Sequence, residues 1–267
     1  MLFLGLDRPS AIAVREQELA KARSATARNL VTTSLSVRFN DDPLFPTGMS
    51  QLLSIASSIV KRHGRLIEAD VAYCCERSNM LVKRNEQLPI TKAALRAVAN
   101  GRARCDGGLE LPFHPEDNAG TFEIDILAVD EANAWGCAIS SKRGGGTTES
   151  QKRKEHESNL RALDLTLLSQ LQVQYPKLRT ARVVVLDYLG RSGFSDDITL
   201  RRSEIDAFFG LPMVSVLDGT AQGLRNAIKD EFGPLMALAM KTLNPEYNAE
   251  DAAPADPGDE TFACPSI

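Results

Sequence analysis

Two residues, Asp125 and Lys142, have the types and the spacing needed to hydrolyse a phosphodiester bond. That reaction needs a hard cation to neutralise developing charge and activate water, carboxylates to hold the cation, and often a lysine near the water. Asp125 lies in the segment 121–129, and Lys142 ends the segment 134–142. Both segments are typical of strands and are joined by a short polar turn. We therefore expect Asp125 and Lys142 on adjacent antiparallel strands, with their side chains on one face of the sheet.

The alternation of side chains defines the faces of these two predicted strands. The first carries apolar residues at every second position: Phe122, Ile124 and Ile126. Because successive residues of a strand point to opposite faces, we expect Glu123 and Asp125 to share the other face. On the second strand, Ser140 and Lys142 are two residues apart and share a face. The small residues Gly136 and Ala138 leave that face open.

The remaining segments predict an α/β fold in which helices flank a mixed β-sheet. The periodicity of apolar residues and the turn signals predict helices over 50–62, 65–77, 91–98, 149–174, 203–209 and 221–243. The same signals predict strands over 107–113, 121–129, 134–142, 181–189 and 213–217. We expect an N-terminal arm or linker over 1–47 with a helical extension, a core with leading helices over 48–245, and an acidic disordered tail over 246–267.

Composition excludes several classes of protein. No run of about 18 apolar residues exists, which argues against a membrane helix, and the apolar N-terminus is too short for a signal peptide, so we expect a cytoplasmic protein. Five scattered cysteines without a Cys-x-x-Cys pair, and three distant histidines, indicate no disulfide framework or zinc site. The glycine-rich segment 144–148 lacks the Gly-Lys-Ser/Thr ending of a P-loop.

The net charge of −4 is unevenly distributed along the chain. Six acidic residues and no Lys or Arg lie from Glu246 onward, so the rest of the chain carries a net charge of +2. Local basic clusters on such a body can bind phosphates. The charge therefore permits a nucleic-acid partner.

The passages Phe122–Ile126 and Ala138–Gly144 resemble the PD-(D/E)xK nuclease superfamily, whose fold is called restriction-endonuclease-like. The resemblance extends loosely over residues 50–217. It implies a core of a helix, a three-stranded meander, a helix and a further strand. By position, Asp125 would be the metal-binding aspartate of the family and Lys142 the lysine of its E-x-K element. Ser140 stands where that element has an acid.

One subgroup of type II restriction enzymes resembles this chain more specifically, because it has Ser-x-Lys and takes the missing glutamate from the following helix. Glu155 follows Lys142 after twelve residues and matches that spacing. Glu149 competes with it, because the apolar stripe of the helix, extended backward, passes through His156 and Glu149. The subgroup also uses a glutamate of the preceding helix, for which Glu68 is the first match and Glu76 the second.

The resemblance implies a Mg²⁺-dependent endonuclease that cleaves DNA, of restriction type and working as a homodimer. Asp125 and Glu155, with Glu68 through water, would hold Mg²⁺, and Lys142 would orient the attacking water. Ser140 would lie beside the metal, and flanking phosphates would contact three basic residues: Arg143, Lys152 and Arg153. Ser140 keeps open an alternative, an inactive nuclease fold that serves as a DNA-binding or assembly subunit. A third hypothesis is that the chain is an unrelated mixed α/β protein whose strands mimic the motif.

Overall fold

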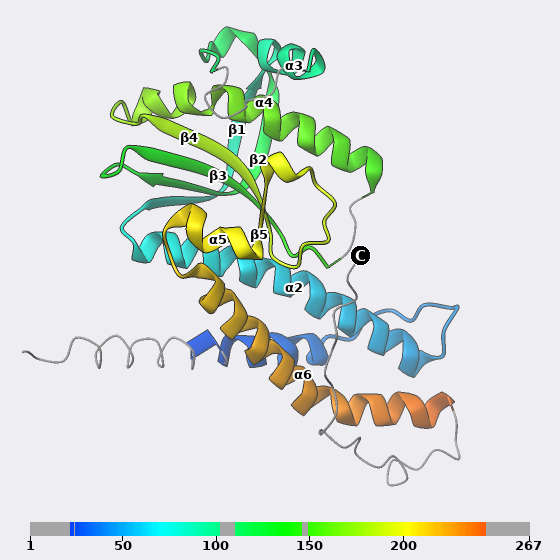
Figure 1. Cartoon of the computed structure of the whole chain (residues 1–267). Coiled ribbons are helices and arrows are strands. Elements are labelled where there is room, and N and C mark those ends of the chain that lie inside the picture. Colours follow the sequence, from blue (N-terminus) through cyan, green and yellow to red (C-terminus); the bar gives the residue numbers. More distant parts are fainter. Residues whose placement is uncertain (1–21, 24, 102–109, 146–148, 244–267) are drawn as a thin grey trace, which may run out of the picture.

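The computed structural model describes residues 22–23, 25–101, 110–145 and 149–243, and its centre is a five-stranded mixed sheet (Figure 1). The strands follow one another in space as in sequence: β1 (Leu81–Thr91), β2 (Asn118–Asp130), β3 (Trp135–Lys142), β4 (Thr180–Asp187) and β5 (Thr199–Arg201). The first three strands form an antiparallel meander, whereas β4 and β5 each pair in parallel with the strand before. The predicted α/β architecture with a mixed sheet is confirmed.

Helices cover both faces of this sheet (Figure 1). One face packs against α2 (Thr47–Arg77), α5 (Arg202–Phe209) and the start of α6 (Met213–Leu243). The other packs against α4 (Ser150–Gln174), and α3 (Lys92–Ala99) packs on α4 in turn. Two short 3-10 helices, Pro115–Asp117 and Asp196–Ile198, precede β2 and β5.

Each face of the sheet has its own apolar core. On the α4 side, the predicted leucine stripe is buried against the sheet: Leu160, Leu163, Leu167 and Leu171. On the α2 side, Ile67 and Val71 pack against Ile126, Ile139 and Leu186. The apolar run in β4 is almost entirely buried, as predicted, because that strand lies between two neighbours and under helices on both faces.

The first strand of the meander was placed wrongly by the sequence pattern. Residues 110–113 form no strand, and the rest of the predicted 107–113 strand lies outside the described residues. The strand is instead β1, at 81–91. This strand lies at the edge of the sheet, where polar residues and a proline such as Pro89 are tolerated, so it lacks the apolar alternation of the other strands.

Two further predictions of secondary structure were wrong. The separate helices 50–62 and 65–77 are one helix, α2, because the glycine at 64 weakens a helix by only about 1 kcal/mol. The predicted strand 213–217 is the first part of α6. A short apolar run fits either element, and the burial of Met213, Leu217 and Ala221 at a spacing of four residues identifies the helix.

Part of the predicted N-terminal arm packs against the core. Residues 25–36 form a helix whose Ala27, Leu30 and Val31 contact apolar residues of α2 and α6. Arg23 forms an ion pair of 2.6 Å with the buried Asp70 of α2. The predicted tail 246–267 lies outside the described residues. Among the helices described, none combines the length and apolarity that crossing a membrane requires.

Candidate functional site

Asp125 lies at the point where β2 and β3 separate. The register between the two strands runs from Asp130 and Trp135 to Ile126 and Ile139, while β3 continues beside β4 as far as Lys142. Beyond Ile139 the carboxylate of Asp125 reaches across the gap. Its Oδ2 accepts a hydrogen bond from the Ser141 backbone N–H at 2.5 Å. The prediction that Asp125 and Lys142 lie on adjacent antiparallel strands is confirmed, whereas the expectation that their side chains share one face of the sheet stays a prediction.

The backbone around Asp125 departs from regular strand geometry. Asn85 of β1 lies between the pairs Arg84–Ile126 and Glu86–Ile124 and has φ of +52°, a left-handed conformation that is rare within strands. Ile124 packs in the α4-side core and Ile126 in the α2-side core, so the predicted strict alternation is wrong at this point. The irregularity opposite Asn85 changes which side chains face each layer. It leaves Asp125 between the two helical layers.

Glu68 of α2 and Lys142 are electrostatically coupled to Asp125. Burial raises the pKa of Asp125, and the positive charge of Lys142 and the Ser141 N–H act in the opposite direction. Burial also raises the pKa of Glu68, and the negative charge of Asp125 raises it further, while Lys142 lowers it. Two partly buried carboxylates and one ammonium are therefore electrostatically coupled at this end of the sheet.

His156 of α4 was not predicted as a member of the site. Its Nε2 lies 3.2 Å from Ser140 Oγ, which is 3.5 Å from Asp125 Oδ2. Burial, followed by the charge of Lys142, lowers the pKa of His156 to about 4, so the ring is neutral at pH 7. The leucine stripe of the helix, extended backward, passes through His156, and that signal could have identified it.

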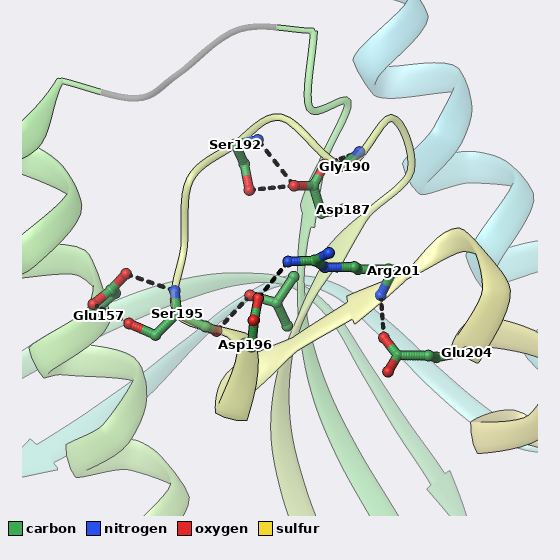
Figure 2. Close-up of polar contacts among 9 residues, drawn as sticks. Glu157, Asp187, Gly190, Ser192, Ser195, Asp196, Arg201 and Glu204 are labelled. Atoms are coloured by element: carbon green, nitrogen blue, oxygen red, sulfur yellow. Dashed lines mark hydrogen bonds and ion pairs between the residues drawn. The ribbon is translucent and has the colours of Figure 1, made fainter. Parts of the chain in front are cut away.

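The loop after β4, whose own polar contacts Figure 2 shows, binds the end of β3 that carries Lys142. The backbone carbonyls of Lys142 and Arg143 accept hydrogen bonds from the N–H groups of residues 188 and 189, at 3.2 and 3.1 Å. The buried carboxylate of Asp187 closes the loop by accepting from the N–H groups of Gly190 and Ser192, both at 2.9 Å, and from the Ser192 hydroxyl. Asp187 thus has a structural role that no pattern in the sequence indicated.

The same loop is anchored to α4 and to its own far end. The carboxylate of Glu157 accepts hydrogen bonds from the backbone N–H and hydroxyl of Ser195, at 2.9 and 3.0 Å (Figure 2). Arg201 forms an ion pair of 2.6 Å with Asp196. Glu157 therefore connects the helix that carries His156 to the loop that holds the end of β3.

The two glutamates proposed to replace the acid missing at Ser140 lie away from this cluster. Glu155 is exposed, and among the described residues it makes no hydrogen bond or ion pair. Because successive residues of a helix are about 100° apart, a helix that directs His156 at Ser140 directs Glu155 elsewhere. Glu149 is also exposed and forms an ion pair of 2.9 Å with Lys152. Glu76 pairs with Arg84 at 3.6 Å.

The basic residues predicted to contact phosphates differ in their exposure and in their contacts with the rest of the protein. Arg143 donates through Nε to His63 Nδ1 at 3.0 Å, and its guanidinium lies against the backbone at Gly145. Burial lowers the pKa of His63 to about 4, with Arg143 contributing. Lys152 and Arg153 lie in the first turn of α4, where Lys152 is exposed. Lys152 is therefore exposed at the start of α4, where it forms an ion pair with Glu149.

The donors at this site suit a divalent cation in chemistry, although they are not yet gathered around one. Carboxylate oxygens such as those of Asp125 and Glu68 are the ligands that Mg²⁺ prefers. A cation between these carboxylates would relieve the repulsion that raises the pKa of Glu68. Within the described residues, no three His, Cys, Asp or Glu side chains already form a group that could hold a metal ion. Binding of a divalent cation would therefore require the side chains of Asp125 and Glu68 to move.

Comparison of the sequence with models of known protein families and with characterised proteins gives no match.

Proposed function

We propose that this protein is a metal-dependent nuclease that hydrolyses phosphodiester bonds of DNA, with Asp125 and Lys142 at its centre. The convergence of these two residues with Glu68 carries the proposal. The carboxylate of Asp125 is held by the Ser141 N–H in the gap between β2 and β3, and the charges of Lys142 and Asp125 both act on Glu68. Helix α2 and the β2–β3 hairpin, which are separated in sequence, thus contribute two acids and one lysine that are electrostatically coupled.

The order of the elements supports a restriction-endonuclease-like core. A helix (α2), an antiparallel three-stranded meander (β1 to β3), a helix (α4) and a parallel strand (β4) follow one another. That is the order which the resemblance to the PD-(D/E)xK superfamily implies. Because one fold hosts many functions, this order supports the fold alone, and the residues of the site support the function.

Each residue has a role that follows from its position. Asp125 Oδ2 is occupied by hydrogen bonds, so Oδ1 would face a divalent cation, together with Glu68. The cation would supply charge neutralisation at the phosphate and a more acidic water. Lys142 would orient the attacking water and stabilise negative charge on the scissile phosphate. Lys152 and Arg153 would contact flanking phosphates, which position the substrate without reading its sequence.

Cleavage assays on matched variants test the proposal. Asp125→Asn keeps the hydrogen-bond acceptor but removes the charge, and Lys142→Met removes the ammonium. Each should reduce cleavage of DNA with Mg²⁺ or Mn²⁺ by at least about 100-fold. The control for the aspartate is Asp130→Asn, on the same strand but in the turn, where it caps Asn133. The control for the lysine is Lys83→Met, on β1.

Three results would contradict the proposal. The first is an equal loss of cleavage activity in the site variants and in their controls. The second is cleavage by the parent protein that persists when a chelator removes divalent cations. The third is no cleavage by the parent on duplex DNA, single-stranded DNA or RNA. Cleavage of both strands of a duplex usually needs two active sites, so we further propose a homodimer, which light scattering would measure.

A binding or assembly subunit with a nuclease fold is the second candidate. The specific observation that favours it is Ser140, which stands in place of an acid, while Glu155 is exposed and directed away. Under this alternative the parent binds DNA without cleaving it. Fluorescence anisotropy would then show binding that Asp125→Asn leaves unchanged and that Lys152→Ala with Arg153→Ala weakens.

A further inference from the structure

His63 of α2 has a buried hydrogen-bond donor that lacks an acceptor. Its Nδ1 accepts a hydrogen bond from Arg143 Nε at 3.0 Å, so the proton of the neutral ring is on Nε2. Burial, followed by the charges of Arg143 and Arg225, lowers the pKa of His63 to about 4, and the ring is therefore neutral at pH 7. Within the described part of the chain, Nε2 has no hydrogen-bond partner, although the residue is only 6% exposed. Because buried donors are almost always paired, this N–H needs an acceptor that the described residues do not supply.

Helix α6 brings Arg225 to the level of His63. On α2, His63 lies between two buried isoleucines of the same face, one turn away on either side: Ile59 and Ile67. Ala221 of α6 packs in the apolar cluster that contains Ile67. Leu224, one turn further along α6, packs in the cluster that contains Ile59. The two helices therefore run antiparallel there, and Arg225, which follows Leu224, lies beside His63.

No carboxylate is paired with the two arginines of this cluster. Among the described residues, neither Arg143 nor Arg225 forms an ion pair, and the side chain of Arg225 is exposed. Asp218 lies two turns before Arg225 on α6 and is influenced by its charge. Its carboxylate is already paired with Arg202, and it accepts a hydrogen bond from the Tyr188 hydroxyl at 2.7 Å. The two arginines therefore remain available to an anion.

We propose that His63, Arg143 and Arg225 form a binding site for a phosphate group of the DNA strand, on the α2 side of the sheet. The oxygens of a phosphodiester only accept hydrogen bonds, and a guanidinium group binds them with parallel N–H donors. The phosphate also supplies the acceptor that His63 Nε2 lacks. Because Arg143 directly follows Lys142 at the end of β3, the bound phosphate is a neighbour of the scissile one.

The inference rests on the proposed function, because the ligand is the same DNA strand, and it adds the direction in which that strand runs. Lys152 and Arg153 lie at the start of α4, which covers the other face of the sheet. Figure 1 shows α2 and α4 on opposite sides of the sheet. A strand that contacts both sets of basic residues therefore crosses the end of the sheet at Lys142, from the α4 side to the α2 side.

Binding of a fluorescein-labelled DNA duplex in the presence of chelator, which prevents metal-dependent cleavage, tests the site. Fluorescence anisotropy of the full chain at several salt concentrations gives the slope of log K against log salt, which reports the number of phosphate contacts. Arg143→Gln and Arg225→Gln should each weaken binding by about tenfold and reduce the slope by about 1. Arg225 is exposed, so its replacement should leave the fold intact. The matched control is Arg179→Gln, an exposed arginine just before β4, at the opposite end of the sheet from Lys142, and it should change neither quantity.

Inorganic phosphate is a second probe and needs no DNA. In nuclear magnetic resonance spectra of the ¹⁵N-labelled parent at pH 7, phosphate should shift the Nε2 signal of His63, because that N–H gains an acceptor. The spectrum of His63→Gln, which lacks the signal, assigns it. In Arg225→Gln the same shift should need about tenfold more phosphate. The signal of the exposed His114 should not shift and controls for general effects of the added salt.

The outcomes separate this inference from the proposed function. An unchanged salt slope in Arg143→Gln and Arg225→Gln, or an equal reduction in Arg179→Gln, overturns the phosphate site, while cleavage by the parent leaves the nuclease proposal standing. A His63 signal that phosphate does not shift also overturns the site. A phosphate-dependent shift in a parent that binds no DNA overturns the assignment of the ligand to a DNA strand. DNA binding that depends on both arginines, in a parent that cleaves no substrate, supports the site and contradicts the nuclease proposal alone.

Discussion

Replacing Gly144 by alanine would show how strongly the end of β3 depends on the loop that follows β4. Gly144 has φ of +71°, a conformation that disfavours residues with a Cβ. An added Cβ would lie 1.7 Å from Asp187 Oδ1, which is impossible without movement. Asp187 cannot move freely, because it is buried and holds Gly190 and Ser192. The substitution therefore combines backbone strain with loss of a buried hydrogen bond.

The magnitude follows from these two effects. A non-glycine residue in the left-handed conformation costs about 1–2 kcal/mol. Losing the hydrogen bond from the Gly190 N–H to a charged carboxylate adds about 1.5–3 kcal/mol. Gly144→Ala should thus lower the free energy of unfolding by about 2.5–5 kcal/mol. For a domain of this size, the melting temperature should fall by about 5–20 °C.

Two other glycines provide matched controls. Gly190 has φ of +70° but open space around the added Cβ, so Gly190→Ala should cost only the strain of about 1–2 kcal/mol. At Gly145 the added Cβ would meet the flexible end of Arg143, which can move, so Gly145→Ala should cost little. Denaturant unfolding of the three variants measures these differences. Equal costs for Gly144→Ala and Gly190→Ala would refute the role assigned to Asp187.

A double-mutant cycle tests whether contact with Asp187 is the source of the cost of Gly144→Ala. Asp187→Ala removes the atoms that the new Cβ would meet. In that background Gly144→Ala should cost only about 1–2 kcal/mol, the strain alone. The two substitutions should therefore be strongly non-additive. Additive costs would show that the contact between the two residues is not the source of the effect.

Two further predictions concern charge. The pKa of Glu68 is raised in the fold, so its neutral form is favoured and its ionisation costs stability as pH rises through that pKa. Glu68→Gln should raise the melting temperature at pH 7 by the equivalent of at most about 1 kcal/mol. This gain should vanish below about pH 4, where the carboxyl group of Glu68 in the parent protein is also neutral. A gain that does not change with pH would contradict this prediction. Arg23→Ala leaves the buried Asp70 without its cation and should cost about 3–5 kcal/mol at pH 7. Because burial raises the pKa of Asp70, the loss should shrink as pH falls, and a pH-independent loss by calorimetry would argue against the ion pair.

The sequence by itself determined the elements whose periodicity is strong. The leucine stripe of α4 and the apolar run of β4 were placed correctly because each lies within a core that demands that spacing. The Thr91 cap of α3 was also correct, since its Oγ1 accepts from the Ala94 N–H at 3.2 Å, a contact between neighbours in sequence. Asp125 and Lys142 followed from the hairpin that joins their strands.

Only the tertiary structure decided what depends on neighbours distant in sequence. β1 became a strand because β2 offers it an edge, and the start of α6 became helical because α2 and α5 cover one of its faces. Which of two residues, Glu155 or His156, faces Ser140 was also decided by the tertiary structure. Both residues match the expected spacing to within one position, and the rotation of α4 that directs one of them at Ser140 is fixed by the packing of its leucines on the sheet. One residue along a helix is about 100° of rotation, which a pattern of spacing does not resolve but a packed core does.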